Sequence, residues 1–99
     1  MIKLYVVVRE DLKGSQKTVQ AIHGAAEYLI RNKDTSWDNG TVVCLKAKNE
    51  DHLNTIKNIL DKKDISYNLF REPDLKNSLT SLAVVLNSRN NCLSNLPLL

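Results

Sequence analysis

The chain of 99 residues is long enough for one domain with a single hydrophobic core and too short for two. Hydrophobic residues make up 42% of the sequence and charged residues 25%, which is typical of a globular domain and excludes a disordered or fibrous chain. The formal net charge of +3 is compatible with a nucleic-acid or phosphate partner but does not identify one.

The longest apolar runs, residues 4–8 and 82–86, are far shorter than the roughly 20 residues that cross a bilayer. No small-residue cleavage site follows the first of them, so we expect a buried strand rather than a signal peptide, a cytoplasmic protein and no membrane partner. The two cysteines, Cys44 and Cys92, do not make a disulfide framework, and the sequence lacks the Cys-x-x-Cys spacing of a zinc site. We therefore expect free thiols and no metal.

The first part of the chain predicts a strand, a loop and a helix. Residues 2–8 are aliphatic and β-branched, which favours a strand buried on both faces. Residues 9–15 are polar and contain a glycine, as loops do. A helix follows from Gln16 to about Arg31, with Ser15 as its N-cap. Its apolar face is formed by residues at helical spacing: Val19, Ile22, Ala26, Leu29 and Ile30.

The second part predicts three further strands and one further helix. In chain order we expect a strand at 41–47, a helix after the N-cap Asn49, a strand at 65–70, a strand at 79–86 and a tail at 87–99. The third strand should end near Pro73, because proline cannot donate to a strand ladder.

These elements define the fold class. The order β-α-β-α-β-β places two helical crossovers first, but the connection before the last strand is too short for a third crossover. The sheet must therefore contain an antiparallel step. We expect a single α/β domain at 1–86, with a four-stranded mixed sheet flanked by helices, and a C-terminal tail at 87–99.

The first helix carries a stripe of polar residues beside its apolar face. Gln16, Gln20, His23 and Glu27 share this stripe because they are spaced 4, 3 and 4 positions apart. An imidazole at such a boundary can act as a general base or a hydrogen-bond donor. The alternative interpretation is the solvated face of an ordinary amphipathic helix.

Three other groups of residues could carry chemistry, and each also has an ordinary structural explanation. Glu72 and Asp74 flank Pro73 at a strand end, where a carboxylate could orient a histidine or a water. Hydroxyls surround the start of the last strand at Ser78, Thr80 and Ser81. Lysine and arginine side chains suited to phosphates lie around the first strand and loop: Lys3, Arg9, Lys13 and Lys17.

Two segments together resemble one known family. Type 2 peptidyl-tRNA hydrolases carry a Val-Arg-x-Asp-Leu-Lys motif, which is similar to Val8-Arg9-Glu10-Asp11-Leu12-Lys13. They also carry an Ala-Ala-Gln-x-x-His-Ala-Ala motif, which is similar to Val19-Gln20-Ala21-Ile22-His23-Gly24-Ala25-Ala26. The resemblance covers residues 2 to about 86. The family's Asp-Ala-Gly loop is replaced here by Glu72-Pro73-Asp74, which lacks its glycine.

The resemblance implies a hydrolase that cleaves the ester between a peptide and tRNA, with tRNA as partner and without a metal or organic cofactor. The catalytic residues that it implies are His23, Glu72 or Asp74, Thr80 and Lys17, and the substrate-binding residues are Gln20, Arg9, Asp11 and Lys13. One alternative is a non-catalytic module on the same fold that binds tRNA, a nucleotide or a protein. Another is an interaction protein that forms a homodimer through the apolar tail at 96–99.

Overall fold

The structure, a computed structural model, describes residues 1–99 apart from the side chain of residue 90. Its elements in chain order are β1 (Ile2–Arg9), α1 (Gly14–Arg31), β2 (Val42–Ala47), α2 (Glu50–Lys62), β3 (Asn68–Glu72), the 3-10 helix η1 (Pro73–Leu75), β4 (Ser78–Asn87) and the 3-10 helix η2 (Ser88–Asn90). The predicted order β-α-β-α-β-β is confirmed.

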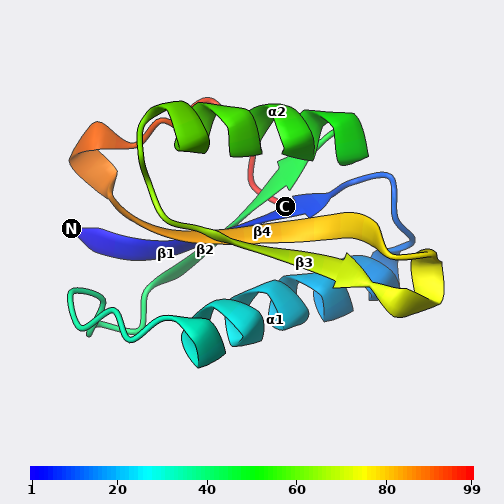
Figure 1. The fold of residues 1–99 in the computed structure, drawn as a ribbon, viewed down its shortest axis with the longest axis horizontal. Coiled ribbons are helices and arrows are strands. Elements are labelled where there is room, and N and C mark those ends of the chain that lie inside the picture. The colour runs from blue at the N-terminus through cyan, green and yellow to red at the C-terminus, as the bar shows by residue number, and fades with distance from the viewer.

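The four strands form one mixed sheet in the spatial order β2-β1-β4-β3. β1 pairs in parallel with β2 and antiparallel with β4, and β3 pairs antiparallel with β4. Helix α1 covers one face of the sheet and α2 covers the other (Figure 1). The antiparallel step between β3 and β4 is therefore the one that the short connection required.

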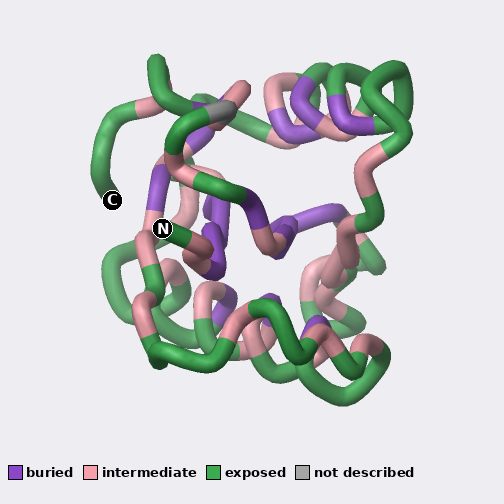
Figure 2. Tube along the Cα trace, turned by 90° about the vertical axis from the view of Figure 1, so that its left-hand side faces the viewer, coloured by how far each residue is buried: buried purple, intermediate pink, exposed green. Residues whose placement is uncertain are grey.

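The central strand β1 supplies both hydrophobic cores, as predicted. Leu4, Val6 and Val8 belong to the cluster on the α1 side, while Tyr5 and Val7 belong to the cluster on the α2 side. All five are buried, and each fully buried aliphatic side chain contributes about 1.5–3 kcal/mol to folding. Figure 2 shows that buried residues concentrate along the sheet, whereas the sides of both helices that face away from the sheet are exposed.

Helix α1 starts earlier than predicted. It begins at Gly14 with Lys13 at the N-cap position, and no side chain caps its first turn. Ser15 lies inside the helix, so the prediction of Ser15 as N-cap was wrong. The prediction for the second helix is confirmed, because the side chain of Asn49 accepts a hydrogen bond from the His52 N–H of α2 (2.9 Å).

The apolar face of α1 does not pack on the sheet. Ile22 and Ile30 are 64% and 78% exposed, whereas Gln20, Gly24 and Tyr28 are buried. The face that meets the sheet combines Gln20 and Tyr28 with the small residues Ala21, Gly24 and Ala25, and Gly24 allows the helix backbone to lie close to β4. The close approach at Gly24, the hydrogen bonds of Gln20 and the packing of Tyr28 in the α1-side core therefore position α1.

Strand β3 is shifted toward the C-terminus relative to its predicted range of 65–70. It begins at Asn68 and continues to Glu72, and Pro73 then starts η1. The predicted alternation is confirmed: Ile65, Tyr67 and Leu69 pack on the α2-side core. The opposite side of the strand faces α1, and this side carries the candidate site.

The C-terminal tail packs on its own chain. Leu93 is buried in the α2-side core, and Leu98 forms an antiparallel bridge with Leu45 of β2. The Lys46 N–H donates to the Pro97 carbonyl (3.0 Å), and the Leu99 N–H donates to the Cys44 carbonyl (3.0 Å). The tail thus pairs with part of the exposed edge of β2, which would otherwise present unpaired backbone groups.

The described part of the chain also shows the state of the cysteines and the character of the helices. Cys44 and Cys92 are free thiols. None of its helices has the length and apolar character that a bilayer crossing requires.

Candidate active site on the α1 face of the sheet

A β-bulge brings two hydroxyl residues to the same face of β4. The β3–β4 register pairs Phe70 with Ser81 and Arg71 with Leu79, so Thr80 has no partner residue on β3. A bulge of this kind redirects a side chain that strict alternation would send to the other face. Leu79 belongs to the α2-side core, whereas Thr80 and Ser81 both contact α1.

Thr80 is the first member of a hydrogen-bonded chain of three side chains. Its hydroxyl donates to Gln20 Oε1 (2.6 Å), and Gln20 Nε2 donates to Glu72 Oε1 (2.9 Å). The second carboxylate oxygen of Glu72 accepts the Asp74 N–H at 3.5 Å, at the start of η1. The chain therefore links β4, α1 and the end of β3, and it orients the carboxylate of Glu72.

Burial separates the roles of these three residues. Gln20 and Thr80 are both 0% exposed, whereas Glu72 is half-buried. The interpretation of the α1 stripe as a solvated face is therefore wrong for Gln20. A ligand arriving from solvent meets Glu72, while Gln20 and Thr80 lie behind it and fix its position.

We predict that Thr80→Val lowers the free energy of unfolding by about 1–3 kcal/mol, because the buried oxygen of Gln20 loses its donor. Thr80→Ser keeps the hydroxyl and should recover most of this loss. Chemical denaturation of both variants measures the effect.

The matched control is Ser81→Ala at the next position of β4. The Ser81 hydroxyl is buried and has no hydrogen-bond partner within the described structure. Its removal should leave stability unchanged or raise it slightly. If Thr80→Val and Ser81→Ala had equal effects, the Thr80–Gln20 hydrogen bond would not hold the site together.

His23 lies on the turn of α1 that follows Gln20 and stacks on Phe70 of β3. The ring centroids are 4.5 Å apart and the rings are inclined by only 2°. Beyond this pair, Asn32 Nδ2 donates to Asn68 Oδ1. The residues at alternate positions 68, 70 and 72 of β3 thus meet three successive partners on the α1 side of the sheet. Phe70 was not among the predicted site residues, although its place in the alternation could have indicated it.

The remaining predicted catalytic residues lie at the same end of the molecule. Figure 1 shows the first turn of α1 next to η1, where β3 ends. Lys17 is half-buried and lies one turn before Gln20, while Asp74 is exposed in η1. Of the two carboxylates that the sequence left open, Glu72 is the one that contacts α1.

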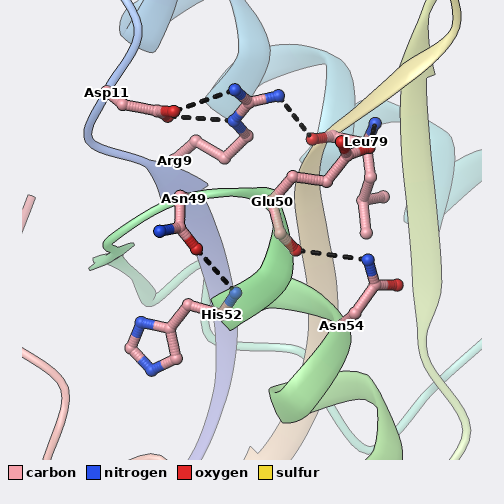
Figure 3. Close-up of polar contacts among 7 residues, drawn as sticks. All are labelled: Arg9, Asp11, Asn49, Glu50, His52, Asn54 and Leu79. Atoms are coloured by element: carbon pink, nitrogen blue, oxygen red, sulfur yellow. Dashed lines mark hydrogen bonds and ion pairs between the residues drawn. The ribbon is translucent and has the colours of Figure 1, made fainter.

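Arg9 and Asp11 form a clamp at the end of β1. Arg9 donates two hydrogen bonds to the Asp11 carboxylate (2.9 Å each) and a third, from Nη1, to the Leu79 carbonyl (3.3 Å). Figure 3 shows this clamp beside the first turn of α2, where the Glu50 carboxylate accepts the Leu79 N–H (2.7 Å). Arg9 and Asp11 therefore hold the bulged start of β4, and Lys13 is exposed nearby at the start of α1.

The clamp predicts a pH dependence of stability. Hydrogen bonds from Arg9 lower the pKa of Asp11 from its ordinary value, so the carboxylate stabilises the fold above the unfolded pKa of about 3.9. This contribution is lost as the pH falls through the folded pKa. The melting temperature of Asp11→Asn should be below that of the wild type at neutral pH, and the difference should vanish at strongly acidic pH.

The control for this measurement is Asp38→Asn, which removes an exposed carboxylate that makes none of the ion pairs of the described residues. If the two asparagine variants showed the same pH dependence, the effect would come from overall charge rather than from the clamp.

No cluster of three or more potential metal ligands, and no pocket, occurs among the described residues. The site consists of the half-buried Glu72 carboxylate, which accepts a hydrogen bond from the buried Gln20 amide, and the Thr80 hydroxyl, which donates to that amide; Lys17 and His23 lie one turn before and one turn after Gln20 on α1. Such groups can bind and activate a water molecule and can contact a polar substrate.

Fold and site together define a small α/β protein with a carboxylate-centred site at one end of a mixed sheet. The model of the family Peptidyl-tRNA hydrolase PTH2 matches residues 2–92, so the chain belongs to the PTH2 family. This confirms the resemblance seen in the sequence.

A solved structure supports the fold. The protein of unknown function Atu0240 from Agrobacterium tumefaciens strain C58 aligns with a TM-score of 0.66 over 89% of this chain and 88% of its own length. The two sequences are 15% identical, so this similarity concerns the fold alone. No curated protein matches the sequence of the chain.

Proposed function

We propose that this protein hydrolyses the ester bond between a peptide and the 3′ end of tRNA. The observation that carries the proposal is the oriented carboxylate of Glu72, held through Gln20 and Thr80 within a chain of the PTH2 family. Membership of the PTH2 family supports a hydrolytic reaction, and the hydrogen-bonded chain offers a group that can activate water.

In the proposed reaction, Glu72 accepts a proton from a water molecule as that water attacks the ester carbonyl carbon. The bond between this carbon and the ribose 3′-oxygen then breaks, the 3′-oxygen leaves with the proton that Glu72 took from the water, and the new carboxylic acid loses its remaining proton to solvent. The products are tRNA with a free 3′-hydroxyl and a peptide with a free carboxylate. This assignment requires neither a metal nor an organic cofactor.

Two side chains of α1 flank Glu72 in this scheme. The ammonium of Lys17, one turn before Gln20, supplies positive charge for the oxyanion that develops on the carbonyl. His23, one turn after Gln20, is available to hydrogen-bond the ester or the leaving oxygen. Gln20 and Thr80 are positioning residues, because both are buried behind Glu72.

The substrate would be recognised partly through its phosphates. The net charge of +3 favours a polyanion, and Lys13 and Lys17 lie at the start of α1, the helix whose Gln20 contacts Glu72. Arg9 and Asp11 contribute indirectly, since their side chains are engaged with each other and with β4. Binding should weaken as the salt concentration rises.

A second candidate function is a non-catalytic module that binds tRNA or another nucleotide ligand. One observation favours it: Glu72 already accepts hydrogen bonds at both carboxylate oxygens, from Gln20 and from the Asp74 N–H. In this case the same surface would bind tRNA and leave the ester intact.

One experiment separates the two candidates. The wild-type chain is incubated with an N-acetylated aminoacyl-tRNA, and the release of N-acetylamino acid is followed beside an established peptidyl-tRNA hydrolase and an enzyme-free sample. Binding of the same tRNA is measured in parallel. Hydrolysis supports the esterase, and binding without hydrolysis supports the non-catalytic module. If the chain neither hydrolyses nor binds this tRNA, the proposed substrate is wrong.

A further inference from the structure

We infer that the stacked rings of His23 and Phe70 form a platform for the terminal base of the tRNA 3′ end. The inference rests on the proposed function, because it takes the acylated 3′-nucleotide as the ligand. The surface on which the base would stack is formed by two aromatic rings that are nearly parallel, with centroids 4.5 Å apart.

Both rings are partly exposed to solvent. In a stacked pair, each ring covers only one face of the other, and both His23 and Phe70 are half-buried rather than buried. Phe70 lies on β3, the edge strand of the sheet, so no further strand covers it on that side. Stacking of single-stranded bases on aromatic side chains is the common mode of such recognition.

The distance between the platform and Glu72 fits one nucleotide. Phe70 and Glu72 are two residues apart on β3, and both face α1, which separates their backbone positions by roughly 7 Å. In an acylated 3′-terminal nucleotide, the ribose alone separates the base from the ester oxygen. A base on the platform therefore places the ester beside the carboxylate.

Polar groups flank the platform on both sides along β3. Glu72 follows it toward η1, and the Asn32–Asn68 amide pair precedes it on the strand. Stacking requires neither charge nor a base-specific hydrogen bond, so the aromatic pair supplies affinity for the last nucleotide while the lysines at the start of α1 supply affinity for phosphates. Phe70 is then a specificity-determining residue for an intact 3′ end.

The test compares two RNA probes on the wild-type chain by fluorescence anisotropy at low salt. One is a short single-stranded RNA that ends in cytidine-cytidine-adenosine. The other has the same length and charge but lacks the terminal base. We expect the intact RNA to bind about tenfold more tightly. Equal affinity for the two probes would overturn the inference.

Substitutions at Phe70 test whether the preference for the intact RNA depends on its aromatic ring. Phe70→Leu keeps an apolar side chain but removes the ring, so the preference for the intact RNA should disappear, whereas Phe70→Tyr should retain it. Tyr67→Leu is the matched control, because Tyr67 lies just before β3 and packs on the opposite, α2 side. A preference that persists in Phe70→Leu would overturn the inference, and thermal unfolding verifies that each variant is folded.

The outcome is independent of catalysis. The probes contain no ester, so a preference for the intact end supports the platform even where peptidyl-tRNA stays uncleaved, a result that would refute only the proposed activity. Conversely, a wild-type chain that hydrolyses peptidyl-tRNA but binds both probes equally would retain the proposed function and lose the platform.

Discussion

Replacing Glu72 with glutamine is expected to lower kcat for peptidyl-tRNA hydrolysis by about 10²- to 10⁴-fold, the usual contribution of a general base. The substitution preserves the shape of the side chain. The new amide oxygen can still accept the hydrogen bond from Gln20 Nε2, so the chain to Thr80 stays intact. What is lost is the basic carboxylate itself. Single-turnover kinetics on N-acetylaminoacyl-tRNA measure the effect, and KM should change little.

The comparison variant is Asp74→Asn. The sequence left Glu72 and Asp74 open as alternatives, and the structure connects Glu72 to the buried amide while Asp74 is exposed in η1. The asparagine variant should therefore keep a kcat close to that of the wild type. A large loss in Asp74→Asn together with an active Glu72→Gln would transfer the role of general base to Asp74.

The second large effect is expected from Gly24→Ala in α1, which should lower the free energy of unfolding by about 1–3 kcal/mol. A Cβ atom at Gly24 would lie 2.7 Å from Ser81 Oγ and 3.2 Å from Ser81 Cβ. Both contacts are with a central strand that cannot move easily, so the helix must shift away from the sheet. Denaturant unfolding measures the loss, which outweighs the better helix propensity of alanine.

Two variants test the cause of this effect. Gly14→Ala is the matched control in the same helix, because a Cβ there meets nothing within 4 Å, and it should not destabilise the protein. Adding Ser81→Ala to Gly24→Ala removes the closest contact and should restore part of the stability. Equal effects of the two glycine substitutions would show that backbone entropy, rather than the close approach of α1, determines the result.

The main features of the fold could be predicted from the sequence because they depend on local patterns. The apolar run at 2–8 predicted a strand buried on both faces, and Asn49 predicted the start of α2. The short connection before the last strand predicted the antiparallel step. Each of these inferences uses residues within a few positions of one another.

The candidate site could be predicted only in part, because its key contacts are long-range. The spacing of Gln20 and His23 indicated a shared stripe, but the burial of Gln20 depends on Thr80, which lies 60 positions away. Thr80 reaches α1 only because a bulge interrupts the β3–β4 register. A single sequence gives no signal for that bulge, and strict alternation would place Thr80 with the α2-side core.

The apolar face of α1 shows a second reason for incorrect prediction. Helical spacing correctly grouped Val19, Ile22 and Ile30 on one face, but the sheet packs against the face that contains Gly24 and Gln20. Amphipathicity usually identifies the buried side of a helix. Here the buried side of the helix is set by close backbone packing at Gly24, the hydrogen bonds of Gln20 and the packing of Tyr28 in the α1-side core.

Whether this protein is a peptidyl-tRNA hydrolase is tested by the rate at which the wild-type chain releases the acyl group from N-acetylaminoacyl-tRNA. We predict a rate well above that of the enzyme-free sample, together with the loss of activity in Glu72→Gln. A wild-type rate equal to spontaneous hydrolysis, under conditions where an established peptidyl-tRNA hydrolase cleaves the same tRNA, would show that the protein does not catalyse this reaction.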